Sequence, residues 1–229
     1  MTNRHGCKLG AVVLKVSVYK DYENGRLGLG VKVVAEKATL ADLLEAWEPL
    51  ADDDSVFKQY AQDNYSPCKG CRVNCCKQAY VIPDLVSLKK MSDYLRLSPL
   101  EFAIRYFDQE KLRLNLPRLR SSPCTFLVED CCSVYPARTL ICRFYLCTHI
   151  LGETEELIYS IALAGMAATQ LYLNGLGIID LGGEVYGMSS YEACLRSLLD
   201  SSRETEGARA FLEAHDYSDI PLTVFNLGR

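Results

Sequence analysis

The sequence lacks several patterns that would place it in a common functional class. It has no basic run interleaved with aromatics, so we predict no nucleic-acid partner. The glycine-rich residues 25–30 (GRLGLG) precede a predicted strand rather than a helix, and so do not predict a nucleotide-binding turn. The C-x3-C-x2-C triplet typical of radical S-adenosylmethionine enzymes is absent. Internal repeats and long linkers are absent as well, which favours one integrated domain.

Neither a secretory signal nor a membrane span is indicated. Lys15 interrupts the first apolar run and no small-residue cleavage site follows, so we expect a cytoplasmic protein whose thiols stay reduced. Residues 157–179 carry no charge over about the length that a bilayer requires. The segment holds polar side chains such as Gln170, and no basic residue flanks it. We interpret it as a buried helix and predict no membrane contact.

The predicted fold class is α+β, packed as one compact unit. About half of the 229 residues are apolar (49%), which is enough to bury a core without disulfide support. Residues 1–64 should form a small N-terminal α/β region with a β-hairpin and a helix. Residues 65–150 form a central cysteine-rich segment, and residues 151–229 should form a helical C-terminal region.

Local patterns predict the individual elements. Valine-rich residues 11–19 and 29–35, on either side of turn-like residues 21–28, predict the hairpin. Residues 83–95 and 99–112 have helical spacing, whereas residues 112–120 alternate leucine with polar residues and predict an edge strand. Four predicted helix starts share a hydroxyl cap followed three residues later by a carboxylate. They are Thr39 with Asp42, Ser98 with Glu101, Ser189 with Glu192, and Ser201 with Glu204.

Cysteine is the clearest functional signal. The chain has 11 cysteines, an odd number, and in a reducing compartment this favours metal ligation or catalysis over a disulfide framework. A single free cysteine is often only a small buried apolar residue, but nine in two tight clusters predict metal ligands. The clusters are Cys68, Cys71, Cys75 and Cys76, then Cys124, Cys131, Cys132, Cys142 and Cys147. Cys7 and Cys194 lie apart, and we treat them as ordinary residues.

The adjacent pair Cys75 and Cys76 should point in different directions on a strand or helix. We therefore expect the two to serve separate centres, or one to bind while the other packs. Eight ligands would make two tetrathiolate sites or one polynuclear site. Residues 65–150 carry a net charge of +6, against −2 before them and −8 after them. This excess would compensate a centre of about −2, because bound thiols are deprotonated.

The spacing C-x2-C-x3-C-C, followed by C-S-V-Y-x-x-R-x-x-x-C-R-x-[FY], resembles the YkgJ-type cysteine-cluster family over roughly residues 65–150. Members are described as zinc- or iron-chelating domains with eight cysteines. The resemblance implies the ligands Cys68, Cys71, Cys75, Cys76, Cys124, Cys132, Cys142 and Cys147. It also implies that Tyr135, Arg138 and Arg143 accompany them, contacting the centre or a substrate. Cys132 is preferred to Cys131 because it begins the C-S-V-Y unit.

The resemblance leaves several functions open. Metal binding through cysteine comes first, with a [4Fe-4S]-type centre narrowly ahead of zinc, because all-thiolate coordination suits both and the spacing is irregular. Similar proteins include flagellin lysine N-methylases, which implies an enzyme that modifies a protein substrate as the alternative. A thiol redox switch is the third hypothesis, although Cys68-x2-Cys71 lacks a thioredoxin-like setting. We interpret His149, two residues after Cys147, as a structural residue.

Overall fold

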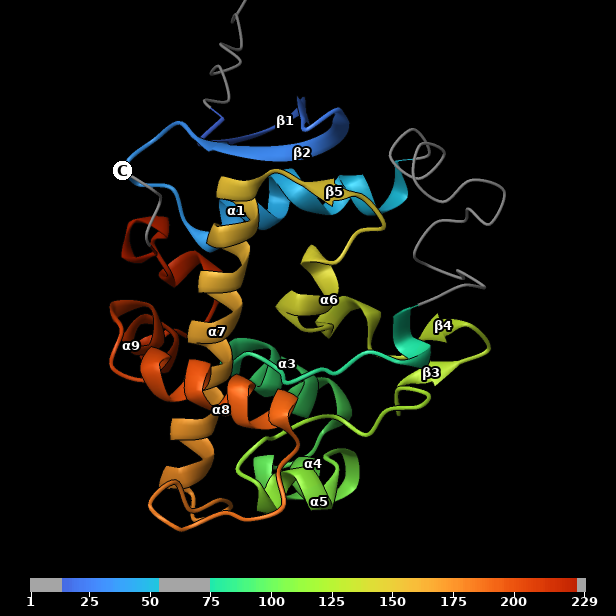
Figure 1. Cartoon of the computed structure of the whole chain (residues 1–229), viewed down its shortest axis with the longest axis vertical. Coiled ribbons are helices and arrows are strands. Elements are labelled where there is room, and N and C mark those ends of the chain that lie inside the picture. The colour runs from blue at the N-terminus through green and yellow to red at the C-terminus, as the bar shows by residue number, and fades with distance from the viewer. Residues whose placement is uncertain (1–13, 54–74, 226–229) are drawn as a thin grey trace, which may run out of the picture.

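The long helix α7 (Gly152–Gly175) forms the central axis of the protein, whose computed structural model describes residues 14–53 and 75–225 (Figure 1). A β-hairpin lies across one end of α7, and the short helices α4 (Pro99–Tyr106) and α5 (Gln109–Arg113) lie toward the other. The cysteine-bearing segments occupy one side of the molecule (Figure 1). Helices and two small sheets pack together as a mixed α+β unit, which confirms the predicted fold class.

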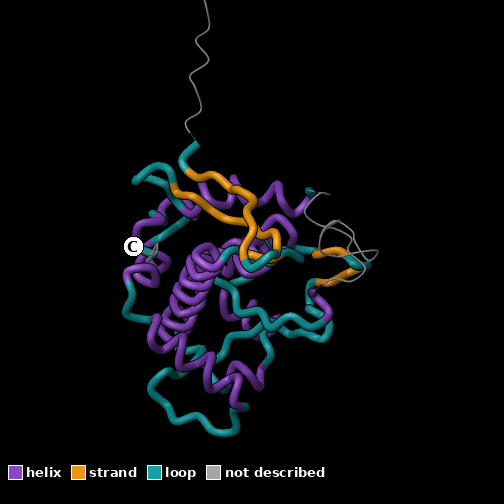
Figure 2. Tube along the Cα trace, turned by 45° about the horizontal axis from the view of Figure 1, so that its top comes forward, coloured by secondary structure: helices purple, strands orange, loops and turns teal. Residues whose placement is uncertain are grey.

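The predicted hairpin is confirmed, with a tighter turn than expected. Strands β1 (Val16–Glu23) and β2 (Arg26–Val33) pair antiparallel along their whole length. The turn is only Asn24 and Gly25, with φ angles of 53° and 77°, and this left-handed geometry matches the twist of the strands. The short strand β5 (His149–Ile150) adds to β2 in parallel (Figure 2). Residues 11–13 of the predicted first strand lie outside the described residues.

Capping patterns correctly located several helices. Thr39, Ser98 and Ser189 each form a capping box, at the starts of α1 (Leu40–Trp47), α4 and α8 (Ser190–Ser202). Helix α3 (Leu85–Leu95) confirms the helical spacing of residues 83–95 and is capped by Asp84. The C-terminal region is mostly helical, as predicted, and also includes α9 (Glu206–Glu213).

Two of the predicted helix boundaries are wrong. Residues 99–112 do not form one helix, because the buried Phe107 is extended and Asp108 caps a new helix, α5, by accepting from the N–H groups of Glu110 and Lys111. Ser201 does not start a helix either. It lies inside α8, and Thr205 instead caps α9 by accepting from the N–H of Ala208.

The predicted edge strand over residues 112–120 is also wrong. Leu112 belongs to α5, and Asn115 has a φ of 61°, which breaks any extended run. The only ladder contact found in this described segment is an isolated bridge between Phe107 and Leu119. Leu112, Leu116 and Leu119 are nevertheless buried and Leu114 is partly buried. The irregular chain also bonds to α7, where the Gln170 amide donates to the Asn115 carbonyl.

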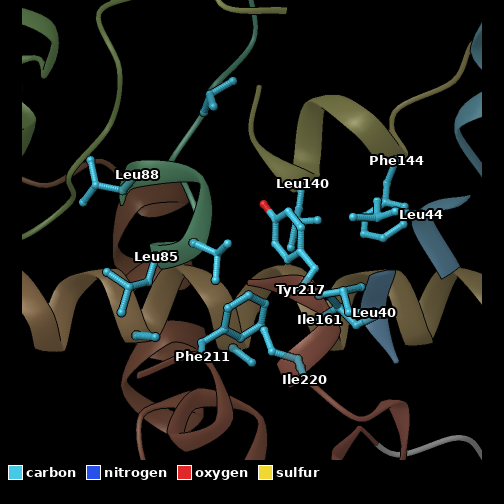
Figure 3. Close-up of a cluster of buried hydrophobic side chains, with 14 of the residues drawn as sticks. Leu40, Leu44, Leu85, Leu88, Leu140, Phe144, Ile161, Phe211, Tyr217 and Ile220 are labelled. Atoms are coloured by element: carbon cyan, nitrogen blue, oxygen red, sulfur yellow. The ribbon is translucent and has the colours of Figure 1, made fainter. Parts of the chain in front are cut away.

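The apolar segment around residues 157–179 is confirmed as a buried helix. By length and composition α7 could span a bilayer, but 61% of its most apolar window is buried within the protein. Its neighbours include α3, α8 and α9. Figure 3 shows Ile161 and Phe211 in one apolar cluster with residues from α1, α3 and α6 (Leu140–Phe144). The segments that carry Cys124, Cys132 and Cys142 pack against this core.

Candidate metal centre

Six of the eight predicted ligands line one pocket. They are Cys75, Cys76, Cys124, Cys132, Cys142 and Cys147. The other two, Cys68 and Cys71, lie outside the described residues. The two cysteine clusters are far apart in the sequence, yet the fold brings six of their seven described members to the same place. We call this the cysteine pocket.

The first cluster reaches the pocket through the short 3-10 helix η3 (Cys75–Lys77). The Cys76 carbonyl accepts a hydrogen bond of 2.7 Å from the N–H of Cys124, which joins the two clusters through their backbones. Both Cys75 and Cys76 line the cysteine pocket. Both expectations for this pair, separate centres or one ligand beside a packed neighbour, stay predictions. Within η3 the two side chains lie close enough for a hydrogen bond between them.

Cys75 also changes the acidity of its neighbour. A side-chain hydrogen bond from Cys75 lowers the pKa of Cys76 to about 7, and the positive charge of Arg138 contributes in the same direction. The lowered pKa makes the thiolate form of Cys76 accessible near neutral pH. A thiolate is the form that binds metal.

A small hairpin turns the side chains of the two adjacent cysteines of the second cluster, Cys131 and Cys132, in different directions. Strands β3 (Leu127–Val128) and β4 (Cys131–Cys132) meet through a turn at Glu129 and Asp130, which have φ angles of 48° and 57°. Side chains alternate along a strand, so Cys132 faces the cysteine pocket while Cys131 is exposed outside it. This geometry supports the choice of Cys132 over Cys131.

Helix α6 carries the predicted ligand Cys142, whose side chain is half-buried. Burial raises the pKa of its thiol to about 12, and the nearby Cys76 and Cys124 raise it further, while the Thr139 hydroxyl opposes them. Burial likewise raises the pKa of Cys124 and of Cys132. These thiols hold their protons until a metal ion displaces them, so metal binding at the pocket would release protons.

Arg138 is the predicted companion residue that the structure places at the pocket. Its side chain is 8% exposed, and its guanidinium carbon lies 3.7 Å from the ring centroid of Tyr135, which also lines the pocket. Nε and Nη1 of Arg138 are buried and have no hydrogen-bond partner among the described residues. Two buried guanidinium nitrogens without hydrogen-bond acceptors are costly, so this side chain fits a negatively charged group inside the pocket.

Arg143 has a different position from the one implied by the resemblance. It does not line the cysteine pocket. Its Nε donates to the carbonyl of Arg138 at 2.9 Å, its Nη2 donates to the carbonyl of Pro136 at 2.8 Å, and Nη1 pairs with Glu48. These contacts shape the loop that carries Arg138, so Arg143 supports the pocket from behind.

His149 and Cys194 lie apart from the pocket. Nε2 of His149 is 3.0 Å from Glu23 Oε2, which agrees with a structural interpretation. Cys194 is exposed on α8 and is not part of the pocket. Cys7 lies outside the described residues.

Only part of the apolar wall of the pocket could be expected from the sequence, where residues 125–128 (TFLV) are apolar and could shield a cluster. Met91, Leu119, Phe126 and Val134 line it together with the cysteines. Each comes from a different segment, so only the tertiary fold reveals that they share a surface. They surround the thiols with groups that do not compete for metal and that exclude water.

The thiols surround a space and do not converge on a point. Within residues 14–53 and 75–225, no three His, Cys, Asp or Glu side chains are already gathered closely enough to hold one ion. A tetrahedral zinc site with bonds of about 2.3 Å needs its sulfurs about 3.8 Å apart. Binding one such ion would therefore require the described thiols to move closer together, or the predicted ligands Cys68 and Cys71, which lie outside the described residues, to take part.

Comparison with known families agrees with this geometry. Residues 67–160 match the CxxCxxCC family model, described as "Putative zinc- or iron-chelating domain". The match confirms the resemblance inferred from the cysteine spacing and assigns this segment to a domain class that chelates zinc or iron. It covers less than half of the chain. No curated protein and no solved structure matches the sequence.

Proposed function

We propose that the protein binds a metal centre in the cysteine pocket through eight thiolates, those of Cys68, Cys71, Cys75, Cys76, Cys124, Cys132, Cys142 and Cys147. The observation that carries the proposal is the gathering of six of these cysteines, from both clusters, around one pocket. Chance burial of free cysteines does not account for six at one place. We further propose that the protein is cytoplasmic.

A [4Fe-4S]-type centre is favoured over zinc by a narrow margin. The ligands are spread over a pocket, and each iron of a cubane binds its own thiolate, so such a cluster uses widely spaced cysteines. One zinc ion and one cubane each take four thiolates, so six thiols at the pocket do not separate the two metals and leave ligands for a second centre. The apolar wall would shield an iron-sulfur cluster from solvent. Two neighbouring zinc ions are the competing arrangement.

Arg138 fits this centre as its charge partner. Of the described residues that line the pocket, it is the only arginine or lysine. Its unpartnered Nε and Nη1 could donate to thiolate or sulfide sulfur, which would stabilise the negative charge of the centre. Tyr135 would keep the guanidinium in place by stacking on it.

Elemental analysis of protein purified without oxygen tests the proposal. About four iron and four sulfide per chain, with a broad absorption band near 400 nm, would support the iron-sulfur centre. One or two zinc with a colourless solution would keep the cysteine site but replace the iron-sulfur centre. A chain free of metal, with thiols that oxidise reversibly, would overturn metal binding and support the thiol redox switch.

An enzyme that modifies a protein substrate is the alternative to a metal-binding module. It is favoured by the partial exposure of the pocket, since Cys75, Cys147 and the 54%-exposed Tyr145 lie where a partner could approach. The test is methyl transfer from S-adenosylmethionine to lysine in a protein substrate, using metal-replete protein. Transfer that is lost in Arg138→Gln but kept in Cys194→Ser would support the enzyme.

A further inference from the structure

A buried carboxylate outside the cysteine pocket joins three separate parts of the chain. Asp84 is 2% exposed and caps α3, with its Oδ1 accepting from the N–H of Ser87 at 2.9 Å. Its Oδ2 accepts from the N–H of Leu140 at 3.0 Å and from the Ser87 hydroxyl. Oδ1 also accepts from the Tyr217 hydroxyl at 3.1 Å. The Asp84 side chain thus accepts hydrogen bonds at the starts of α3 and α6 and from Tyr217 in the C-terminal region.

The bond to Leu140 replaces a missing helix cap. Leu140 is the first residue of α6, and its N-cap residue Thr139 makes no side-chain cap hydrogen bond. Asp84 supplies that contact from another segment, with its negative charge at the positive end of the helix. Cys142 is only two residues further along α6, whose length is five residues. So short a helix has little stability of its own, and its orientation depends on such contacts.

The C-terminal region holds the carboxylate in place. Tyr217 is 4% exposed and lies beside Leu140 in the core (Figure 3). Its hydroxyl is 2.6 Å from the Ser87 hydroxyl as well as bonded to Asp84. In α7, Gly165 leaves room for Asp84, because a Cβ at position 165 would lie 2.6 Å from the Asp84 Cβ. The Thr169 hydroxyl donates to the Pro83 carbonyl at 2.8 Å.

We propose that Asp84, held by Tyr217, is a positioning residue for the ligand Cys142, so that the metal centre depends on a region outside the matched chelating domain. Asp84, Ser87 and Leu140 lie within residues 67–160, whereas Tyr217 lies beyond them. The proposal rests on the proposed metal centre. A displacement of α6 would move Cys142 relative to the other thiols without removing any ligand.

The test compares Asp84→Asn with Ser98→Ala in the full-length protein. Asparagine keeps the shape but points N–H donors at a site where four donors already converge, so α6 should lose its cap. Ser98→Ala removes an equivalent cap from α4, which carries no ligand. Metal release to a chelator, measured well below the unfolding midpoint, should be about tenfold faster in Asp84→Asn, the lower end of the effect of outer ligand-orienting groups. In Ser98→Ala it should match the unaltered protein.

A gentler variant covers the case in which Asp84→Asn does not fold. Tyr217→Phe keeps the buried ring and removes one hydroxyl, and should accelerate metal release about fivefold, the equivalent of one lost hydrogen bond. Release at the unaltered rate in every folded variant would overturn the proposal. A merely destabilising effect is excluded if Ser98→Ala, with a comparable loss of stability, leaves release unchanged.

Thiol labelling separates this proposal from the metal proposal. With or without a metal, Cys142 should react with a maleimide faster in Asp84→Asn than in the unaltered chain, while the exposed Cys194 should react equally in both. Unaltered protein without metal, combined with faster Cys142 labelling in the variant, would reject the centre but keep the positioning role. Equal Cys142 labelling in both proteins would reject the positioning role.

Discussion

The segments around the cysteine pocket and the C-terminal helices are stabilised in different ways. Near the pocket, β3 and β4 have two residues each, α6 has five, and η3 and η4 (Tyr135–Ala137) have three each. By contrast, α7 has 24 residues, of which 12 are buried. Short elements contribute few backbone bonds and little apolar area, so they need another source of order. A metal centre bound by cysteines from both clusters would provide it.

Metal removal should have the largest effect and should affect the two regions unequally. Structural zinc sites contribute roughly 10–16 kcal/mol of binding free energy, which becomes folding free energy for the segments that carry the ligands. We expect a chelator to abolish hydrogen-exchange protection around β3, β4 and α6 and to leave most of it in α7. Equal loss in both regions would mean that the core itself depends on the metal.

Cys142→Ser should be the most damaging single ligand substitution. Burial raises the pKa of the Cys142 thiol to about 12, and a serine there would leave a polar group in an apolar wall as well as an incomplete centre. We expect loss of metal together with loss of solubility, measured by metal content of the soluble fraction. Cys194→Ser is the control and should change neither quantity. A soluble Cys142→Ser protein with full metal content would show that Cys142 is not a ligand.

The neighbours Cys131 and Cys132 offer a matched pair on one hairpin. Cys132→Ser should lower the metal content, whereas Cys131→Ser should not, because only Cys132 faces the pocket. Their positions in the sequence differ by one residue, so any general effect on the hairpin should be shared. The reverse result would assign the ligand to Cys131 and would require a different orientation of β4.

Arg138→Gln should weaken the centre without removing it. Loss of the buried positive charge should reduce metal affinity about 10- to 100-fold, as for other groups that contact ligands. If the centre is an iron-sulfur cluster, its reduction potential should become more negative, because the reduced state carries the extra negative charge. Arg138→Lys should restore part of both properties. An unchanged potential and affinity would show that Arg138 does not face the centre.

The smallest predicted effect lies far from the pocket, at the start of α9. Thr205→Ala removes the cap that accepts from the Ala208 N–H and should lower the free energy of unfolding by about 1 kcal/mol. Ser201→Ala should cost less, since Ser201 is exposed within α8. Denaturant titration measures the loss of unfolding free energy. Elemental analysis should show that neither substitution changes the metal content. If Thr205→Ala lost metal, the cysteine pocket would depend on the C-terminal helices more strongly than the structure indicates.

Local signals predicted the parts of the fold that local interactions decide. The capping boxes at Thr39, Ser98 and Ser189 and the presence of a turn within residues 21–28 involve residues close in sequence, so the sequence alone reveals them. The restriction of that turn to Asn24 and Gly25 was not predicted. The break at Asp108 was hidden because its N–H bonds the distant Arg118 carbonyl. Tertiary contact overrode helical spacing there.

The candidate site shows the same division. The cysteine spacing was enough to suggest which thiols act together, and the family match supports the assignment to a chelating domain. The sequence did not reveal that Cys75 and Cys76 share one pocket, that Arg143 lies outside it, or that Asp84 caps α6. Each of these depends on contacts between residues far apart in the chain, for which a single sequence contains no signal.

X-ray absorption at the iron and zinc edges of the purified protein tests the central claim most directly, because it identifies the atoms bound to the metal. The account predicts a shell made only of sulfur, at about 2.3 Å, with a metal neighbour further out if the centre is an iron-sulfur cluster. A first shell dominated by nitrogen or oxygen at about 2.0–2.2 Å would contradict thiolate ligation at the cysteine pocket.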